Sequence, residues 1–237
     1  MTAAFDFERA WLDKLHRAAS THADQETADS ILAGSEDHSK DASPEEIISW
    51  SQEAMRRLES LVSDESTRIQ IMTDCACQYP KANLAPVAQA YRETGNVDVA
   101  IAMLQQMFED FLRQILGADE PIVKEIRELG WGSAGSRVGD TIQATKIPKS
   151  GHLLQYLQEK DPESRRSLYC HCPRVRDALE LGQTVPRVYC YCGAGFYRGI
   201  WETILGRQVD VSLLSSVLAG DDVCTVAIRL NTEEVPA

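Results

Sequence analysis

Seven cysteines are the residues of this sequence best suited to chemistry, and six of them form three Cys-x-Cys pairs. The pairs are Cys75 with Cys77, Cys170 with Cys172 and Cys190 with Cys192, and Cys224 stands alone. A single buried cysteine often acts as a small apolar residue, but chance seldom places three such pairs in one chain. A disulfide within a pair would close a very small, strained ring. Grouped thiolates need a cation beside them, so the pattern predicts a metal–thiolate site.

Zinc is the metal that the sequence favours, and an iron–sulfur cluster is left open. Zn²⁺ takes four sulfur or nitrogen ligands, an iron–sulfur cluster uses about four thiolates, and Cu(I) also prefers sulfur. The spacing is not the CxxC…CxxC of a zinc ribbon, so the sequence does not fix the metal. Four thiolates around the ion would make a structural site, and fewer with an open position would make a catalytic one.

Charge is distributed unevenly along the 237 residues. The net charge is −12 for the whole chain, −8 for residues 1–70 and +4 for residues 145–200, which also hold four of the seven cysteines. Cations there could stabilise thiolates or an anionic ligand, or could form a solvated face. The acidic balance argues against general nucleic-acid binding. No apolar run is long enough to span a membrane, and the first residues lack a signal-peptide core, so we expect a cytoplasmic protein.

The pattern of apolar residues predicts mainly helices first and a β-hairpin last. Ser43, Pro44 and Glu46 form a strong helix start with a capping box. A polar stretch over 20–42 is expected to be a loose, partly helical connection, and 131–140 a turn-rich loop. Helices are expected near 5–19, 44–62, 65–74, 84–94, 97–116, 120–129, 151–160, 173–181 and 193–205, and strands near 140–148, 208–217 and 223–230. This order predicts an α+β fold, with a helical N-terminal half and a small antiparallel sheet.

The run Gly193-Ala194-Gly195 follows Cys192 directly and opens a predicted helix. It allows either a close approach of the backbone to a metal or anion, or tight packing of the helix on the cysteine segment before it. The sequence slightly favours packing.

The stretch from Val188 to Leu230 resembles the four-vinyl-reductase-type small-molecule-binding domain. The resemblance is carried by Cys190, Gly195, Leu205-Gly206-Arg207, Gly220-Asp221 and Cys224, about a fifth of the chain. It implies a zinc site, with Cys190 and Cys224 among its ligands, beside a ligand pocket. The family's zinc sensors add a Glu and a Cys where this chain has Leu213 and Ser216, so the missing ligands would have to come from other cysteines.

From about Cys75 onward the chain also resembles an uncharacterised bacterial family with CAC, CHCPRVRDAL and YCYCGAGFY segments. That family is related to the L-2-amino-thiazoline-4-carboxylic acid hydrolase-like group, and the resemblance covers about two-thirds of the chain. These likenesses lead us to expect two parts, a helical extension over 1–62 and a cysteine-rich domain over 63–237.

We therefore expect a zinc–thiolate protein that binds or senses a small molecule. The predicted metal ligands are Cys170, Cys172, Cys190, Cys192 and Cys224, with Cys75 and Cys77 as further candidates. The predicted ligand-binding residues are Lys146, Lys149, Arg198, Tyr197 and Trp201. A metal-dependent hydrolase acting on a C=N or amide-type carbon is an alternative, and iron–sulfur or thiol redox chemistry is another. In the redox alternative, nearby arginines such as Arg174 lower thiol pKa values. No nucleic-acid or membrane partner is expected, and a homodimer is left open.

Overall fold

The computed structural model describes residues 6–37 and 42–230, and these have the predicted α+β composition. The chain divides into two compact units, each made from two separate segments. Unit 1 consists of the residues up to Cys77 together with Cys172–Gly195, and unit 2 consists of Gln78–His171 and the residues from Phe196 onward. These units are defined differently from the predicted helical extension over 1–62 and cysteine-rich domain over 63–237, and that division stays a prediction.

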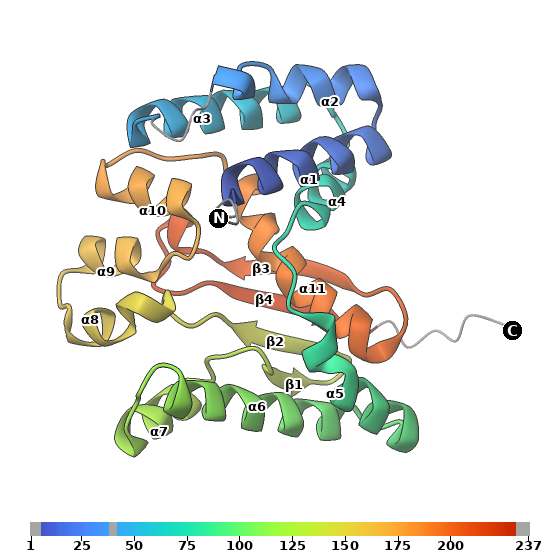
Figure 1. Ribbon diagram of the computed structural model, residues 1–237, viewed down its shortest axis with the longest axis vertical. Helices are drawn as coiled ribbons and strands as arrows, with labels where there is room; N and C mark the ends of the chain where they lie inside the picture. Colours follow the sequence, from blue (N-terminus) through green and yellow to red (C-terminus); the bar gives the residue numbers. More distant parts are fainter. Residues whose placement is uncertain (1–5, 38–41, 231–237) are drawn as a thin grey trace, which may run out of the picture. The chain divides into compact units, whose positions relative to one another are not determined.

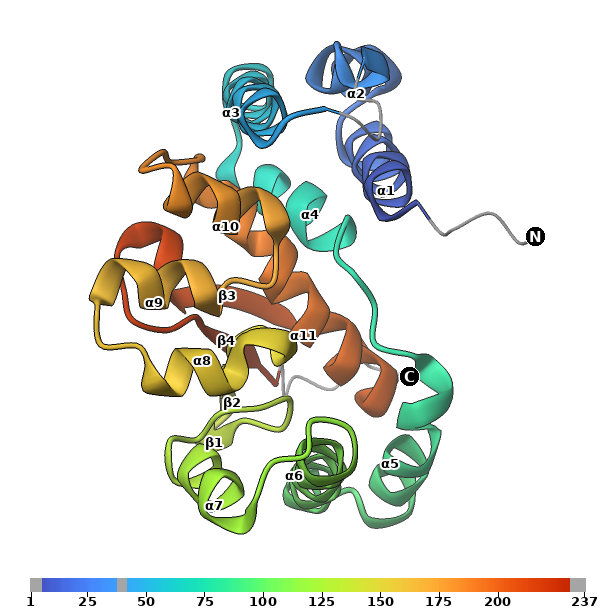
Figure 2. The same ribbon diagram turned by 60° about the vertical axis from the view of Figure 1, so that its left-hand side comes forward.

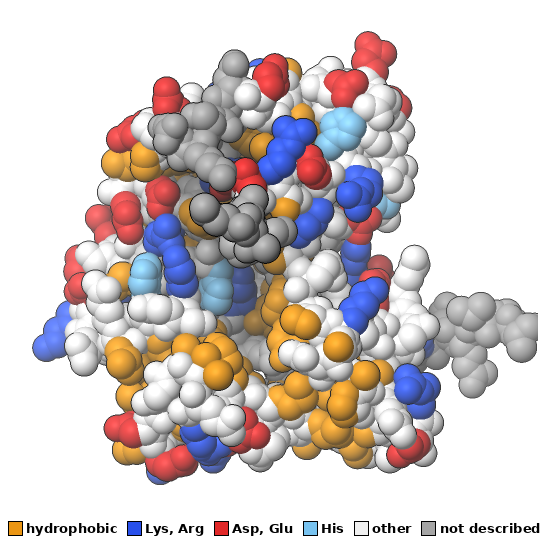
Figure 3. Space-filling model, in the orientation of Figure 1, with side chains coloured by type: hydrophobic (Ala, Val, Ile, Leu, Met, Phe, Trp, Pro, Cys, Tyr) orange, Lys and Arg blue, Asp and Glu red, His pale blue; other side chains and the backbone are white. Residues whose placement is uncertain are grey.

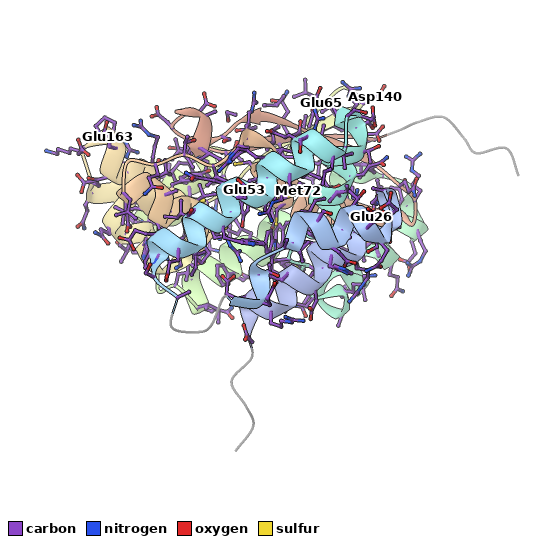
Figure 4. The ribbon with its side chains drawn as sticks, turned by 90° about the horizontal axis from the view of Figure 1, so that it is seen from above. Glu26, Glu53, Glu65, Met72, Asp140 and Glu163 are labelled. Atoms are coloured by element: carbon purple, nitrogen blue, oxygen red, sulfur yellow. The ribbon has the colours of Figure 1, made fainter. Side chains whose placement is uncertain are left out.

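Unit 1 is built from α-helices and short 3-10 helices (Figure 1). They are α1 (Phe7–His22), α2 (Gln25–Leu32), η1 (Ser35–Asp37), α3 (Pro44–Leu61), α4 (Glu65–Asp74), α10 (Pro173–Glu180), η3 (Arg187–Cys190) and the start of α11 (Tyr191–Leu205). Apolar side chains with no exposed surface form its interior, among them Leu15, Ile31, Ile48, Met55, Leu58, Ile71 and Met72. Met72 lies within this unit, whereas Glu26 and Glu65 are exposed (Figure 4).

Local sequence signals explain why several of these helices begin where they do. The Ser43 hydroxyl accepts a hydrogen bond from the Glu46 amide, and the Glu46 carboxylate accepts one from the Ser43 amide, so the predicted capping box is confirmed. The Asp24 and Asp64 carboxylates cap α2 and α4 by accepting hydrogen bonds from the Thr27 and Thr67 amides. The partly helical character expected over 20–42 is confirmed in its described part by the end of α1, by α2 and by η1, whereas the expectation that it is a loose connection is corrected. Acidic side chains over α1–α3 account for the negative charge of this region (Figure 3).

Unit 2 contains an antiparallel sheet with strand order β1-β2-β4-β3 (Figure 1). Its elements are α5 (Lys81–Thr94), α6 (Val97–Gln114), α7 (Glu120–Glu128), β1 (Ser136–Val138), β2 (Thr141–Thr145), η2 (Ser150–His152), α8 (Leu153–Gln158), α9 (Pro162–Tyr169), the rest of α11, β3 (Asp210–Ser215), η4 (Val217–Ala219) and β4 (Thr225–Arg229). The predicted C-terminal hairpin is β3 and β4. In this unit the sequence missed the strand β1, within the stretch expected to be a loop, the helix α9 and the short 3-10 helix η4.

The sheet pairs its apolar residues in register. Ile142 of β2 lies opposite Ile228 of β4, and Ala144 lies opposite Val226, and all four are buried. Three rings, those of Trp131, Tyr156 and Tyr169, pack edge to face or tilted with centroids 5.6–6.4 Å apart in this unit. The helices α8 and α9 lie side by side, as do α5 and α6 (Figure 2). None of the described helices has both the length and the apolar character needed to cross a membrane.

A buried carboxylate joins α6 to α7 in unit 2. The Arg127 guanidinium donates to both oxygens of Glu109 at 2.6 Å, and Arg113 donates to the same carboxylate at 3.1 Å. These hydrogen bonds, chiefly the one from Arg127, lower the pKa of Glu109 to about 2 from 4.5. Ionised Glu109 therefore stabilises the fold fully above about pH 4.5, and this contribution is lost as the pH falls toward 2.

We expect Glu109→Gln to lower the free energy of unfolding by about 2 kcal/mol at pH 7, a value discounted because Arg127 is half exposed. The difference from the wild type should shrink steadily below pH 4.5, since protonation removes the same charge. Urea unfolding at several pH values measures it. Glu128→Gln, at an exposed pair with Lys124, should change stability little. A difference between Glu109→Gln and the wild type that stays constant from pH 7 to pH 2.5 would contradict the assignment.

Candidate functional site

The first part of the site is the end of α4 in unit 1. Cys75 is the residue at the C-terminal cap of this helix, as the sequence predicted, and it has no exposed surface. Its thiol donates a 3.2 Å hydrogen bond to the Met72 carbonyl. Cys77, two residues further on, is exposed. The first cysteine of the CAC motif is therefore directed into the interior of the unit, and the second is not.

The second part is the start of α11, which packs closely against the end of α4. A Cβ atom on Gly195 would lie 2.7 Å from the Ala76 Cβ and far inside van der Waals contact with the Thr73 carbonyl oxygen. Only glycine can occupy that position without movement of the backbone. The interpretation of Gly195 as a packing residue is thereby supported. The close approach brings Cys192 of α11 to Cys75, and their two thiols are hydrogen bonded.

The third part is the segment before α10. Cys172 caps this helix, with Pro173 at its first position. The Cys172 sulfur lies 3.3 Å from the Tyr189 hydroxyl, and it interacts electrostatically with Cys192. Cys75, Cys172 and Cys192 therefore form one group within unit 1, to which each Cys-x-Cys motif contributes one residue. We call it the three-cysteine cluster.

Two cationic side chains flank the three-cysteine cluster. Arg174, only 5% exposed, stacks on the Trp11 ring with its guanidinium carbon 4.2 Å from the ring centroid. It donates to the Tyr189 hydroxyl at 3.3 Å and forms an ion pair with Glu8. Lys14 of α1 donates to the Ala76 carbonyl at 3.3 Å, beside Cys75. The sequence indicates Arg174 as one of the cations over 145–200 and, in the redox alternative, as a residue that lowers thiol pKa values. It gives no sign of Lys14, because nothing local to its helix marks that residue.

Burial controls the ionisation of the cluster thiols. It raises the pKa of Cys75 well above its usual value, and the hydrogen bond with Cys192 acts in the same direction. Burial also raises the pKa of Cys172, against the opposing effect of Arg174. The lowered pKa that the redox alternative required is therefore not found at Cys172. A metal ion would have to displace the protons of these thiols on binding.

The other predicted metal ligands lie in different places. Cys190 ends η3 in unit 1, next to the cluster in sequence. Cys170 and Cys224 belong to unit 2. The Cys224 amide donates to the Tyr169 hydroxyl at 3.0 Å, and its sulfur accepts from the Val217 amide at 3.4 Å. The predicted ligand set is thus divided between the two units, and Cys75 takes a place in the cluster that the sequence left unsettled.

The predicted ligand-binding residues are all in unit 2. Trp201 is fully buried, and Tyr197 is buried with its hydroxyl donating to the Gly132 carbonyl at 3.1 Å. Arg198 lies 3.7 Å from the Glu202 carboxylate on the same helix. The partly exposed Lys146 and Lys149 donate through their backbone amides to Cys224 and Tyr169. These contacts make Tyr197 and Trp201 core residues, and the ligand-binding role of the five stays a prediction.

Comparison with known proteins gives one partial match. A model described as a family of unknown function (DUF6144) matches residues 157–235, a third of the chain. The matched segment includes the cysteines from Cys170 to Cys224 and excludes Cys75, Cys77 and the helices α1 to α7. No curated protein matches the chain, and no solved structure matches it.

Proposed function

We propose that this protein binds a thiophilic metal ion, with zinc expected, through the thiolates of the three-cysteine cluster. The proposal rests on where the cysteines of the three motifs lie. Three motifs separated by up to 117 positions each contribute one cysteine to the same group in unit 1, in which Cys75 is buried and Cys172 and Cys192 are partly exposed. Apolar packing alone has no need of three cysteines from three motifs, whereas a soft cation does.

The charges around the cluster fit this role. Three thiolates with a divalent ion would carry a net charge of −1, which is costly to bury without compensation. Arg174 and Lys14 supply positive charge at the cluster, and Glu8 offsets part of it through its ion pair with Arg174. Tyr189 connects the guanidinium to the Cys172 sulfur through its hydroxyl.

Binding would require some rearrangement of the side chains. Among residues 6–37 and 42–230, no three His, Cys, Asp or Glu side chains already surround a common point as metal ligands. The thiols would have to rotate toward one another, and a fourth ligand would come from Cys77, which interacts electrostatically with Cys75, or from outside the chain. Three protein ligands with an open position would permit small-molecule binding or hydrolysis, whereas four thiolates would favour a structural role.

Metal analysis of the full chain tests the proposal directly. The protein is purified without a His-tag and without oxygen, and its metals, acid-labile sulfide and visible spectrum are measured together. We expect about one zinc ion per chain and no visible band. Iron together with acid-labile sulfide and a brown colour would show that the cysteines bind an iron–sulfur cluster and not zinc. A protein that stays metal-free even after incubation with excess zinc would overturn the proposal.

A further inference from the structure

The contact between Cys75 and Cys192 joins two thiols that are 117 positions apart in sequence. Their hydrogen bond exists because the start of α11 approaches the end of α4 so closely that Gly195 meets the Thr73 carbonyl. Two thiols that share a hydrogen bond can be joined by side-chain rotation where their Cβ atoms come to about 4 Å and their Cα atoms lie about 4.4–6.8 Å apart. Both residues belong to unit 1.

We propose that Cys75 and Cys192 form an oxidisable dithiol site, which peroxide converts to a disulfide. The inference uses the same cysteines as the proposed function, but it requires no metal. The two thiols of a single Cys-x-Cys motif are poor competitors, because their ring would be strained. Cys190 and Cys192 also lie at the junction of η3 with α11, where residues two apart point to opposite sides of a helical turn.

The reaction begins at the more accessible thiol. Cys192 is partly exposed, whereas Cys75 has no exposed surface. The Cys192 sulfur attacks hydrogen peroxide, the O–O bond breaks, and a sulfenic acid and one water form. The Cys75 sulfur then attacks the sulfenic sulfur, the S–O bond breaks, and a second water leaves. Overall, two thiols lose two electrons and two protons, and one peroxide is reduced to two waters.

Cys172, the third thiol of the cluster, can undergo thiol–disulfide exchange with the Cys75–Cys192 disulfide. Cys172 interacts electrostatically with Cys192. A thiolate at Cys172 could attack the Cys192 sulfur and release Cys75, as in ordinary thiol–disulfide exchange. The expected first product is therefore the Cys75–Cys192 disulfide, with Cys172–Cys192 as a minor one. Either disulfide removes two sulfurs from the proposed metal ligands, so oxidised protein should bind little zinc.

The test maps disulfides in the full-length wild-type protein, so that no variant has to fold. Protein stripped of metal by a chelator is treated with one equivalent of hydrogen peroxide, denatured, alkylated and digested without reductant. We expect a cross-linked peptide that contains Cys75 and Cys192, a mass loss of 2 Da, and full reversal by dithiothreitol. The Cys224→Ser variant, altered in unit 2, should give the same cross-link in the same yield.

Other outcomes separate this inference from the metal proposal. Cys75 that remains fully alkylated after peroxide treatment, or cross-links mainly within Cys-x-Cys motifs, would overturn the dithiol site. A chain that forms the disulfide but never binds zinc would keep the dithiol site and remove the proposed function. If the protein both binds zinc and forms the disulfide, zinc-loaded protein should oxidise at least about tenfold more slowly than metal-free protein, because bound thiolates are shielded from peroxide.

Discussion

Replacing Gly195 with alanine will lower the free energy of unfolding by about 3 kcal/mol, a large effect for the addition of one methyl group. The added Cβ would overlap the Thr73 carbonyl oxygen, which belongs to the backbone of α4 and cannot rotate away. The start of α11 must then move away from the end of α4. Chemical denaturation followed by circular dichroism measures the loss of stability.

The same substitution should also weaken the contact between the two thiols, because Cys192 lies on the turn that carries Gly195. We expect the yield of the Cys75–Cys192 cross-link to fall at least about fivefold in folded protein, an order-of-magnitude figure from the distance dependence of disulfide formation. Gly151→Ala is the matched control, since a Cβ there meets nothing within 4 Å and its φ is not positive. Equal stability of Gly195→Ala and Gly151→Ala would show that the close approach does not exist.

Replacing Cys192 with serine will reduce bound zinc from about one ion per chain to less than about 0.1, since a lost thiolate typically removes most of the affinity of a zinc–sulfur site. Cys192 is expected to have the largest effect because it interacts with both Cys75 and Cys172. Cys75→Ser should behave in the same way. Metal analysis after dialysis against a weak chelator measures the loss, and circular dichroism shows whether each variant is folded.

The informative control is Cys224→Ser. The sequence predicts Cys224 as a ligand, whereas the structure places it in unit 2 with its sulfur accepting a hydrogen bond from Val217. A serine oxygen can accept the same bond, so we expect this variant to keep its zinc. Loss of zinc from Cys224→Ser, with retention in Cys75→Ser, would restore the set predicted from the sequence and remove the three-cysteine cluster as the metal site.

Much of the fold could be predicted because its signals are local. The capping box at Ser43 and Glu46, the apolar periodicity of α6 and the turn at Gly220 each lie within a few residues of the element that they define. The signals of α9 and β1 were weaker. The helix α9 has few apolar residues, and β1 is only three exposed residues long, so pairing with β2 decides it.

For the candidate site, less could be predicted from the sequence than for the fold. The sequence by itself determined that three Cys-x-Cys pairs exist and that zinc or another thiophilic ion suits them. It could not determine which cysteine of each pair joins the cluster, because that depends on the packing of segments that are distant in the chain, such as the end of α4 and the start of α11. It also could not show that Arg174 is buried against Trp11. Only the tertiary structure decided these points, since a side chain's burial and electrostatic partners are properties of packing, whereas capping and periodicity are properties of neighbouring residues.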